Sequence, residues 1–210
     1  MKKYLFIGLM AVLATSCEKD PDLSKLDNNF TVYTNYDSKT NFNDFKTYCL
    51  PDSILLIGQG MKAEYWKDEN AQEIIKQVAD EMDTRGYTRV KVIKNANIGL
   101  QLSFTRQTTQ IIGTGGWYGG GWYNGWWGPG YWNDWYYPYP VTYSYNTGTL
   151  IMEMVNLTDH PEDTSQKVKL PVIWHSYATG LLFENSKYNM QLTLDAVNQA
   201  FDQSPYIKKS

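Results

Sequence analysis

The stretch DENAQEIIKQVADEMDTRG, residues 68–86, decides how the rest of the chain can fold. Four of its apolar residues recur at helical spacing: Ile74, Ile75, Val78 and Met82. They form one stripe, which is typical of a helix that packs a single face against a sheet. We therefore predict a helix over residues 68–84 that stops at Arg85 and Gly86, since glycine is the usual residue after a helix end.

Two strand patterns precede this helix. Residues 30–36 alternate apolar and polar side chains, with Phe30 and Val32 on one side, as in a half-buried strand. Residues 46–50 form a second short pattern that ends at Pro51. Because the two are close in sequence, we expect them to be a hairpin or an adjacent pair.

Four further strand patterns follow the helix. Residues 87–93 and 98–109 are expected to be antiparallel neighbours, and residues 141–157 and 168–178 are the longest candidates. The last two present Leu150, Met152 and Met154 on one face, and Val168, Leu170, Val172 and Trp174 on another. Pro171 predicts a sheet edge or a bulge, since proline cannot donate a hydrogen bond to a neighbouring strand.

A second helix closes the chain. Its stripe consists of Met190, Leu194, Val197 and Phe201. The pair Ser204-Pro205 ends it. The elements together predict an α+β fold, a mostly antiparallel sheet with two helices packed on one face, over residues 30–206 as a single domain.

Residues 113–140 interrupt this pattern with an unusual composition. They hold nine Gly, six Trp, six Tyr and three Pro, and Asp134 is the only charged residue. Glycine opposes both helix and strand, so we predict a long loop between strands. We call residues 113–140 the aromatic insertion.

The aromatic insertion is the candidate binding surface. Indole and phenol rings offer large contact areas at low conformational cost, with an N–H or O–H for polar ligands. The candidate residues are Trp117, Tyr118, Trp122, Tyr123, Trp126, Trp127, Trp132 and Trp135. Sugar rings have apolar faces that suit such rings, so a glycan is the first ligand class to test.

Other interpretations of the insertion stay open. Tryptophan and tyrosine favour the lipid headgroup region, and aromatic residues also dominate protein interfaces, including self-association. Stacking on single-stranded nucleic acid is disfavoured because the insertion has no Lys or Arg. A last interpretation is that the rings cover the sheet or one another and bind no ligand.

The first residues have the layout of a secretion signal. Residues 1–16 begin with Lys2 and Lys3 and continue with an apolar run that is too short to span a bilayer, which takes about 20 residues. The run leads to Leu13-Ala14-Thr15-Ser16-Cys17, which resembles a bacterial lipobox. We predict cleavage before Cys17 and lipidation of that cysteine, and two or more fatty chains anchor a protein stably.

Residues 17–29 form the lipidated cysteine and a tether. The tether is polar and charged without periodicity, and as a flexible coil its twelve residues after Cys17 span about 20 Å. Acidic residues close behind Cys17 resemble a surface-export signal of Bacteroidetes lipoproteins, and no Asp follows Cys17 directly. We expect an outer-membrane location, on the periplasmic face or the cell surface.

Short motifs along the chain resemble a family of bacterial lipoproteins known as domain of unknown function 4136. They are Tyr36-Asp37, Asn43-Asp44-Phe45-Lys46-Thr47-Tyr48, Arg85-Gly86-Tyr87, Gly148-Thr149-Leu150, Ile173-Trp174-His175, and Ala196-Val197 before Pro205. The chain departs from the family at Tyr48-Cys49-Leu50 and in its long insertion. No agreed catalytic residues come with this family, so the resemblance implies a fold and an envelope location.

Composition disfavours several functions. The chain without residues 1–16 has 17 basic and 22 acidic side chains, a net charge of −5 that does not favour nucleic acid. Cys49 has no cysteine partner besides Cys17 and is expected to be a buried, inert thiol. His160 and His175 lack further ligands at useful spacing, so we expect no metal and no cofactor.

The sequence contains no recognisable catalytic motif. We therefore expect a protein that is not an enzyme, a binding or structural module of the cell envelope whose partners are the membrane, through Cys17, and a glycan or envelope protein. The alternative is a hydrolase that acts on envelope glycan. A hydrolase would require two carboxylates that converge on one cleft, which a sequence cannot show.

Overall fold

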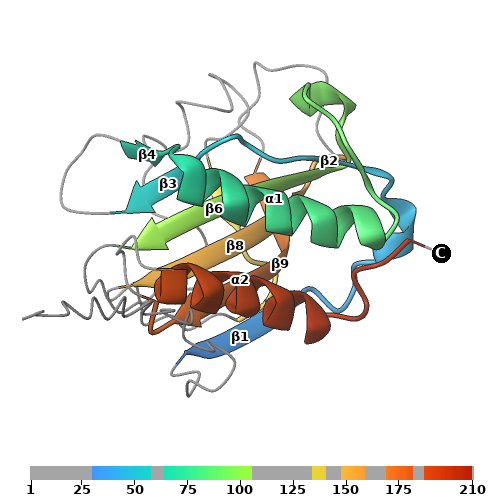
Figure 1. The fold of residues 1–210 in the computed structure, drawn as a ribbon. Helices are drawn as coiled ribbons and strands as arrows, with labels where there is room; N and C mark the ends of the chain where they lie inside the picture. Colours follow the sequence, from blue (N-terminus) through green and yellow to red (C-terminus); the bar gives the residue numbers. More distant parts are fainter. Residues whose placement is uncertain are drawn as a thin grey trace, which may run out of the picture.

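Two helices lie side by side across one face of a β-sheet in the computed structural model of the chain (Figure 1). Helix α1 is Glu69–Thr84 and helix α2 is Lys187–Asp202. The structure describes residues 30–57, 64–105, 134–140, 148–158, 169–181 and 187–209. No helix in these ranges is long and apolar enough to cross a bilayer.

Nine strands form the sheet within the described ranges. They are β1 (Thr31–Tyr36), β2 (Thr47–Cys49), β3 (Ile54–Ile57), β4 (Glu64–Trp66), β5 (Thr88–Arg89), β6 (Ile98–Thr105), β7 (Asp134–Tyr136), β8 (Thr149–Asn156) and β9 (Lys169–Thr179). The strand order is β1-β9-β8-β6-β2-β5, with β3 on β6, β4 on β3 and β7 on β9. Two single-turn helices, η2 (Phe42–Asp44) and η3 (Ile93–Asn95), connect strands.

The α+β class with both helices on one face is confirmed, but the prediction of a mostly antiparallel sheet is wrong because the sheet is mixed. Strands β2 and β3 both run parallel to β6, and β2 also runs parallel to β5. Helix α1 follows the β3–β4 hairpin and precedes β5 and β6. It returns the chain to the end of the sheet where β2 begins, so β5 and β6 run in the same direction as β2 and β3. Antiparallel pairs join β1 to β9, β9 to β8 and β8 to β6.

Two predicted strand pairings are also wrong. Strand β1 pairs with β9 instead of β2, and the short β5 pairs with β2 instead of β6. The predicted strand over residues 87–93 overlaps η3 at Ile93, because η3 begins at that residue and ends at Asn95. Alternation of apolar and polar residues indicates that a segment is a strand, but it does not specify the neighbour of that strand.

Both predicted helices are present, and the ends of α1 are those that its sequence indicated. The Asp68 side chain accepts a hydrogen bond from the Ala71 N–H at 3.1 Å and caps the first turn. Gly86 ends the helix with a φ of 88°, a conformation that favours glycine. After α2 the chain remains packed, since Ile207 is fully buried.

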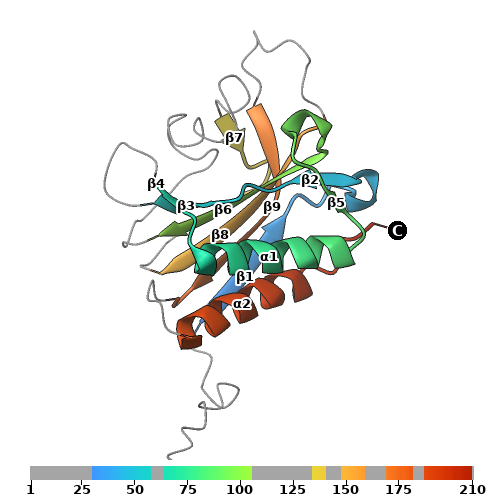
Figure 2. The same ribbon diagram turned by 45° about the horizontal axis from the view of Figure 1, so that its top comes forward.

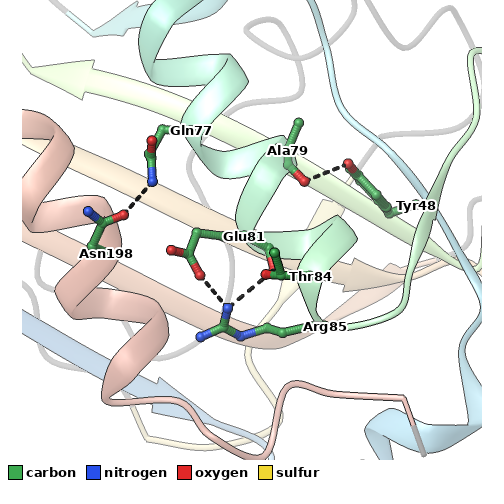
Figure 3. Close-up of polar contacts among 7 residues, drawn as sticks. All are labelled: Tyr48, Gln77, Ala79, Glu81, Thr84, Arg85 and Asn198. Carbon is green, nitrogen blue, oxygen red and sulfur yellow. Dashed lines mark hydrogen bonds and ion pairs between the residues drawn. The ribbon is translucent and has the colours of Figure 1, made fainter.

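One polar contact, drawn in Figure 3, and one cation–π contact join the described parts of the two helices. The Gln77 amide donates to the Asn198 carbonyl oxygen at 2.5 Å. Arg85 pairs with Glu81, and its guanidinium carbon lies 4.9 Å from the centre of the Phe201 ring. These contacts hold the end of α1 on α2 and fix the pair as one layer.

The sheet has a buried cluster on each face. The helices cover the main core, and we call the opposite side of the sheet the far face. The buried cluster on the far face consists of Cys49, Leu55, Ile57, Ala96, Trp135, Tyr137, Ile151, Val155, Leu157, Leu170 and Val172. A simple two-layer fold would leave this face to solvent, so its burial indicates a further covering layer.

A bulge divides strand β9 between the two faces. The register with β8 shifts between Met154 and Val155, beside the predicted irregularity at Pro171. Val172 therefore joins the far face whereas Trp174 packs against the helices, so the expectation that these two share a face is wrong. The bulge changes which side chains of β9 point to each side.

The end of the aromatic insertion is a strand rather than a loop. Strand β7 runs parallel to the start of β9, with Tyr136 opposite Pro171. The last glycine of the insertion is Gly130, and the ring-bearing residues after it favour extended structure. The loop prediction is therefore wrong for residues 134–136, and residues 113–133 lie outside the described ranges.

Candidate functional site

A row of polar side chains crosses the far face. Gln101 of β6 lies directly opposite Glu153 of β8, and Glu153 lies opposite His175 of β9. His175 in turn lies opposite Asn35 of β1. Because paired residues on adjacent strands point to the same side, the four side chains form one line across neighbouring strands.

Three members of this row are buried, although their alternation with the core residues of each strand would place them in solvent. Glu153 is 0% exposed, His175 1% and Gln101 4%. Acidic side chains are almost never fully buried without hydrogen-bonding partners. The row therefore requires polar groups from whatever covers it.

Residues 134–140 supply that cover. Figure 2 shows β7 on the side of the sheet away from the helices. The Tyr137 hydroxyl donates a hydrogen bond to Oε1 of Glu153, and the Tyr139 hydroxyl lies 3.0 Å from Nδ1 of His175. We call Gln101, Tyr137, Tyr139, Glu153 and His175 the buried polar network.

The aromatic rings of the network also pack on one another. The Tyr139 ring stacks on the His175 ring, with centroids 5.6 Å apart and planes 9° apart. The Tyr137 ring meets His175 edge-on, with centroids 5.5 Å apart and planes at 86°. Both arrangements are favoured for aromatic pairs, so His175 is held by a stacked and an edge contact as well as a hydrogen bond.

Burial sets the protonation of the network. It lowers the pKa of His175 to about 3, so this imidazole is neutral near pH 7. Burial, together with the nearby carboxyl groups of Glu153 and Asp37, raises the pKa of Tyr139 far above its ordinary value. A general base works best when its pKa is close to the operating pH, so His175 is a weak base at neutrality.

A groove lies beside the network at one end of the sheet. Its volume is about 560 Å³. It is lined by Asp37, Lys39, Thr40, Asn41, Asp44, Phe45, Tyr136, Pro138, Asn156, Thr158, Pro171 and Ile173. Side chains alternate along an extended segment, so Trp135 and Tyr137 pack on the sheet while Tyr136 and Pro138 line the groove.

One of the candidate binding residues lies in the described part of the chain. Trp135 is 3% exposed and belongs to the cluster on the far face, so its ring is part of the packing. The other seven rings and Cys17 lie outside the described residues. Cys49 is a buried free cysteine, as expected, and burial raises the pKa of its thiol.

Metal ligands do not gather in the described ranges. No group of three or more His, Cys, Asp or Glu side chains there is placed to hold an ion. Besides the Gln101 amide, the buried polar network brings together one carboxyl, one imidazole and two phenols. The phenol of Tyr137 bonds to the Glu153 carboxyl, and that of Tyr139 bonds to the His175 imidazole. Within the described residues, the buried polar network is a structural feature, and the groove beside it is the candidate binding site.

Sequence patterns alone do not single out Glu153 or Tyr137. Glu153 lies between Met152 and Met154, and this alternation ordinarily indicates a residue in solvent. One sequence feature does indicate that Glu153 is buried. Its neighbours at i−2 and i+2, Ile151 and Val155, are apolar and point to the far face as it does. A strand with aliphatic residues on both faces indicates that both faces are covered.

Comparison with known proteins identifies a family and similar solved structures. A model for the family described as Domain of unknown function (DUF4136) matches residues 32–206. A crystal structure of a DUF4136 family protein from Bacteroides thetaiotaomicron has a TM-score of 0.70 and 41% sequence identity, covering 88% of this chain and 100% of that chain. No protein with a curated description matches.

A second solved structure is only distantly similar. A PDZ domain protein from Parabacteroides distasonis has a TM-score of 0.39 and 13% sequence identity, and the match covers 85% of this chain and 37% of that chain. At this level of similarity it supports no inference about fold or activity.

Removal of the Tyr137 hydroxyl should destabilise the fold. Tyr137→Phe takes a donor from the buried Glu153 carboxyl, and such losses lower the free energy of unfolding by about 1–3 kcal/mol. The loss should shrink in a Glu153→Gln background, where the acceptor is an uncharged amide. Urea denaturation of the four combinations measures this coupling. Tyr33→Phe, at a ring 43% exposed, is the control, and equal losses in both backgrounds would contradict the contact.

His175 should make the protein less stable in acid. Its pKa is about 3 when folded and about 6.5 when unfolded, so between these values only the unfolded chain binds the proton. The free energy of unfolding then falls as pH drops from about 6.5 toward 3, by at most about 1.4 kcal/mol per unit. His175→Gln should lose this part of the slope in urea denaturation between pH 7 and pH 4. His160→Gln, at the other histidine of the chain, is the control and should keep it. Identical slopes for wild type and His175→Gln would refute the assignment.

Proposed function

This chain belongs to the DUF4136 family, whose description assigns no activity, and we propose that it is a lipid-anchored, non-catalytic binding module of the bacterial outer membrane. Its described domain would act as a fixed base that presents the aromatic insertion to an envelope glycan. The observation that carries this proposal is the attachment of the end of the insertion to the far face through Tyr137 and Tyr139.

The anchoring part of the proposal rests on the N-terminal sequence. The lipobox-like residues before Cys17 direct lipidation, and residues 18–29 link that cysteine to β1. Two or more acyl chains give stable membrane attachment, and the tether lets the domain move about 20 Å from the bilayer. The outer membrane is favoured because no Asp follows Cys17 directly.

The binding part rests on how the insertion is held. A binding site is most precise when rigid elements support it. Strand β7 is paired with β9, Trp135 is buried, and Tyr137 is hydrogen-bonded to a fully buried residue. The rings that precede β7 in sequence are therefore presented from a fixed point, which lowers the ordering cost of binding.

The chemistry of the described residues favours binding over catalysis. Glycoside hydrolysis uses two carboxyl groups that flank the scissile bond. Within the described residues Glu153 is the one fully buried acid, and Tyr137 of the covering segment occupies Oε1. His175 has a pKa too low for base catalysis near neutrality. A glycan hydrolase therefore remains the second choice.

Lipidation of Cys17 is the first prediction of this proposal. Full-length protein from its native cells should fractionate with the outer membrane, and mass spectrometry should find acyl groups on Cys17 as the first residue. Cys17→Ser should abolish both. Cys49→Ser is the matched control, because Cys49 is buried in the domain and should not affect anchoring. An unmodified Cys17 sulfur in the wild-type protein would end the anchoring proposal.

Loss of the insertion's rings should abolish ligand binding. The test variant replaces Trp117, Tyr118, Trp122, Tyr123, Trp126, Trp127 and Trp132 with serine. It keeps Trp135, whose ring packs on the sheet. Calorimetric titration of full-length protein in detergent with peptidoglycan fragments and neutral oligosaccharides should show binding that weakens at least tenfold in the variant, with liposomes as the comparison probe. Unchanged binding, or binding to liposomes alone, would contradict the glycan role.

A further inference from the structure

The groove beside the buried polar network has the chemistry of a sugar site. We propose that it binds one end of a neutral oligosaccharide, an inference that rests on the binding function proposed above and gives it a second, defined contact surface. Its volume of about 560 Å³ lies in the usual range for small-molecule sites. We call the groove formed by its twelve lining residues the sugar groove.

One wall supplies hydrogen-bonding groups suited to hydroxyls. The Asn41 amide donates to Oδ1 of Asp44 at 2.9 Å, which orients an amide and a carboxylate side by side on the surface. Asp37 accepts a hydrogen bond from the Lys39 N–H at 3.0 Å. A carboxylate can accept about four hydrogen bonds, so both aspartates keep acceptor capacity for sugar hydroxyls.

Three rings of the lining supply apolar surface. Tyr136 and Pro138 line the groove from the end of the aromatic insertion, and Pro171 adds a third ring. Tyr136 is half-buried and lies opposite Pro171 in the pairing of β7 with β9. The planar Tyr136 ring, flanked by two proline rings and by the oriented amide and carboxylate groups, matches a pyranose, which has an apolar face and a hydroxyl-bearing edge.

The walls are fixed before any ligand arrives. The Asp37 N–H donates to the Ile173 carbonyl at 3.0 Å, which attaches the loop after β1 to β9. Phe45 is buried and packs edge-on against Phe42. In the covering segment, Tyr137 points to the sheet and bonds to Glu153, so Tyr136, the preceding residue of the extended segment, points away from it.

The charge of the groove favours a neutral ligand. It contains the acidic Asp37 and Asp44 and the basic Lys39. The two carboxylates repel an anionic polymer, and Lys39 offsets part of their attraction for a cation. Amide, hydroxyl and carboxylate groups of both donor and acceptor character remain, and a neutral polyol can use them all.

Calorimetric titration of the full-length protein in detergent tests the proposal. The probes are cellotetraose, maltotetraose, mannotetraose and chitotetraose, with tetragalacturonate and tetralysine as charged comparisons. At least one neutral probe should bind. Tyr136→Ala should weaken that binding at least tenfold and Asp44→Ala at least fivefold, whereas Tyr136→Phe, which keeps the ring, should bind nearly as well as wild type. Tyr33→Ala, an exposed tyrosine outside the groove, is the matched control and should bind as wild type.

The outcomes distinguish binding in the sugar groove from binding by the seven rings that precede β7. Melting temperatures of all variants identify any that fail to fold, and the Tyr136→Phe comparison isolates the ring. If the variant with seven serines loses binding while Tyr136→Ala retains it, the seven rings that precede β7 bind and the sugar groove does not. The reverse result supports the sugar groove and refutes the role of those seven rings. Absence of binding to every neutral probe, or binding only to a charged one, overturns the proposal.

Discussion

The burial of the Glu153 carboxyl group on the far face is the constraint on which the rest of the structure depends. Burial of such a group is costly unless hydrogen bonds replace its water. The helices cannot help, because they lie on the other side of the sheet. The cover must therefore bring a donor, and Tyr137 is that donor. Its bond to Glu153 fixes residues 134–140 across the far face, and the alternation of side chains then turns Tyr136 and Pro138 toward the groove.

The parts of the fold that local chemistry specifies could be predicted from the sequence. Helix α1 has a capping aspartate, one apolar stripe and a terminal glycine, and all three act within a few residues. The strands were found approximately where their apolar positions indicated, as in β6 and β8. Their neighbours could not be predicted, because pairing depends on α1 acting as a crossover and on a bulge at Met154 and Val155.

The candidate site was harder to predict than the fold for a related reason. Asp44, Tyr136 and Asn156 are far apart in sequence, and only the sheet topology brings them to one groove. Glu153 and His175 alternate with core residues, which ordinarily places a side chain in water. The composition of the aromatic insertion did indicate a special segment, but not that Trp135 and Tyr137 at its end would be part of the packing.

The path of β1 relates the anchor to the groove. The chain enters β1 at Thr31, opposite Thr179, and leaves it at Tyr36, beside Asp37 of the groove. Six residues of extended strand span about 20 Å, so the entry point of the tether and the groove lie at opposite ends of the strand. Under the anchoring proposed for Cys17, the groove is therefore at the end of β1 that is farther from the point where the tether joins the domain.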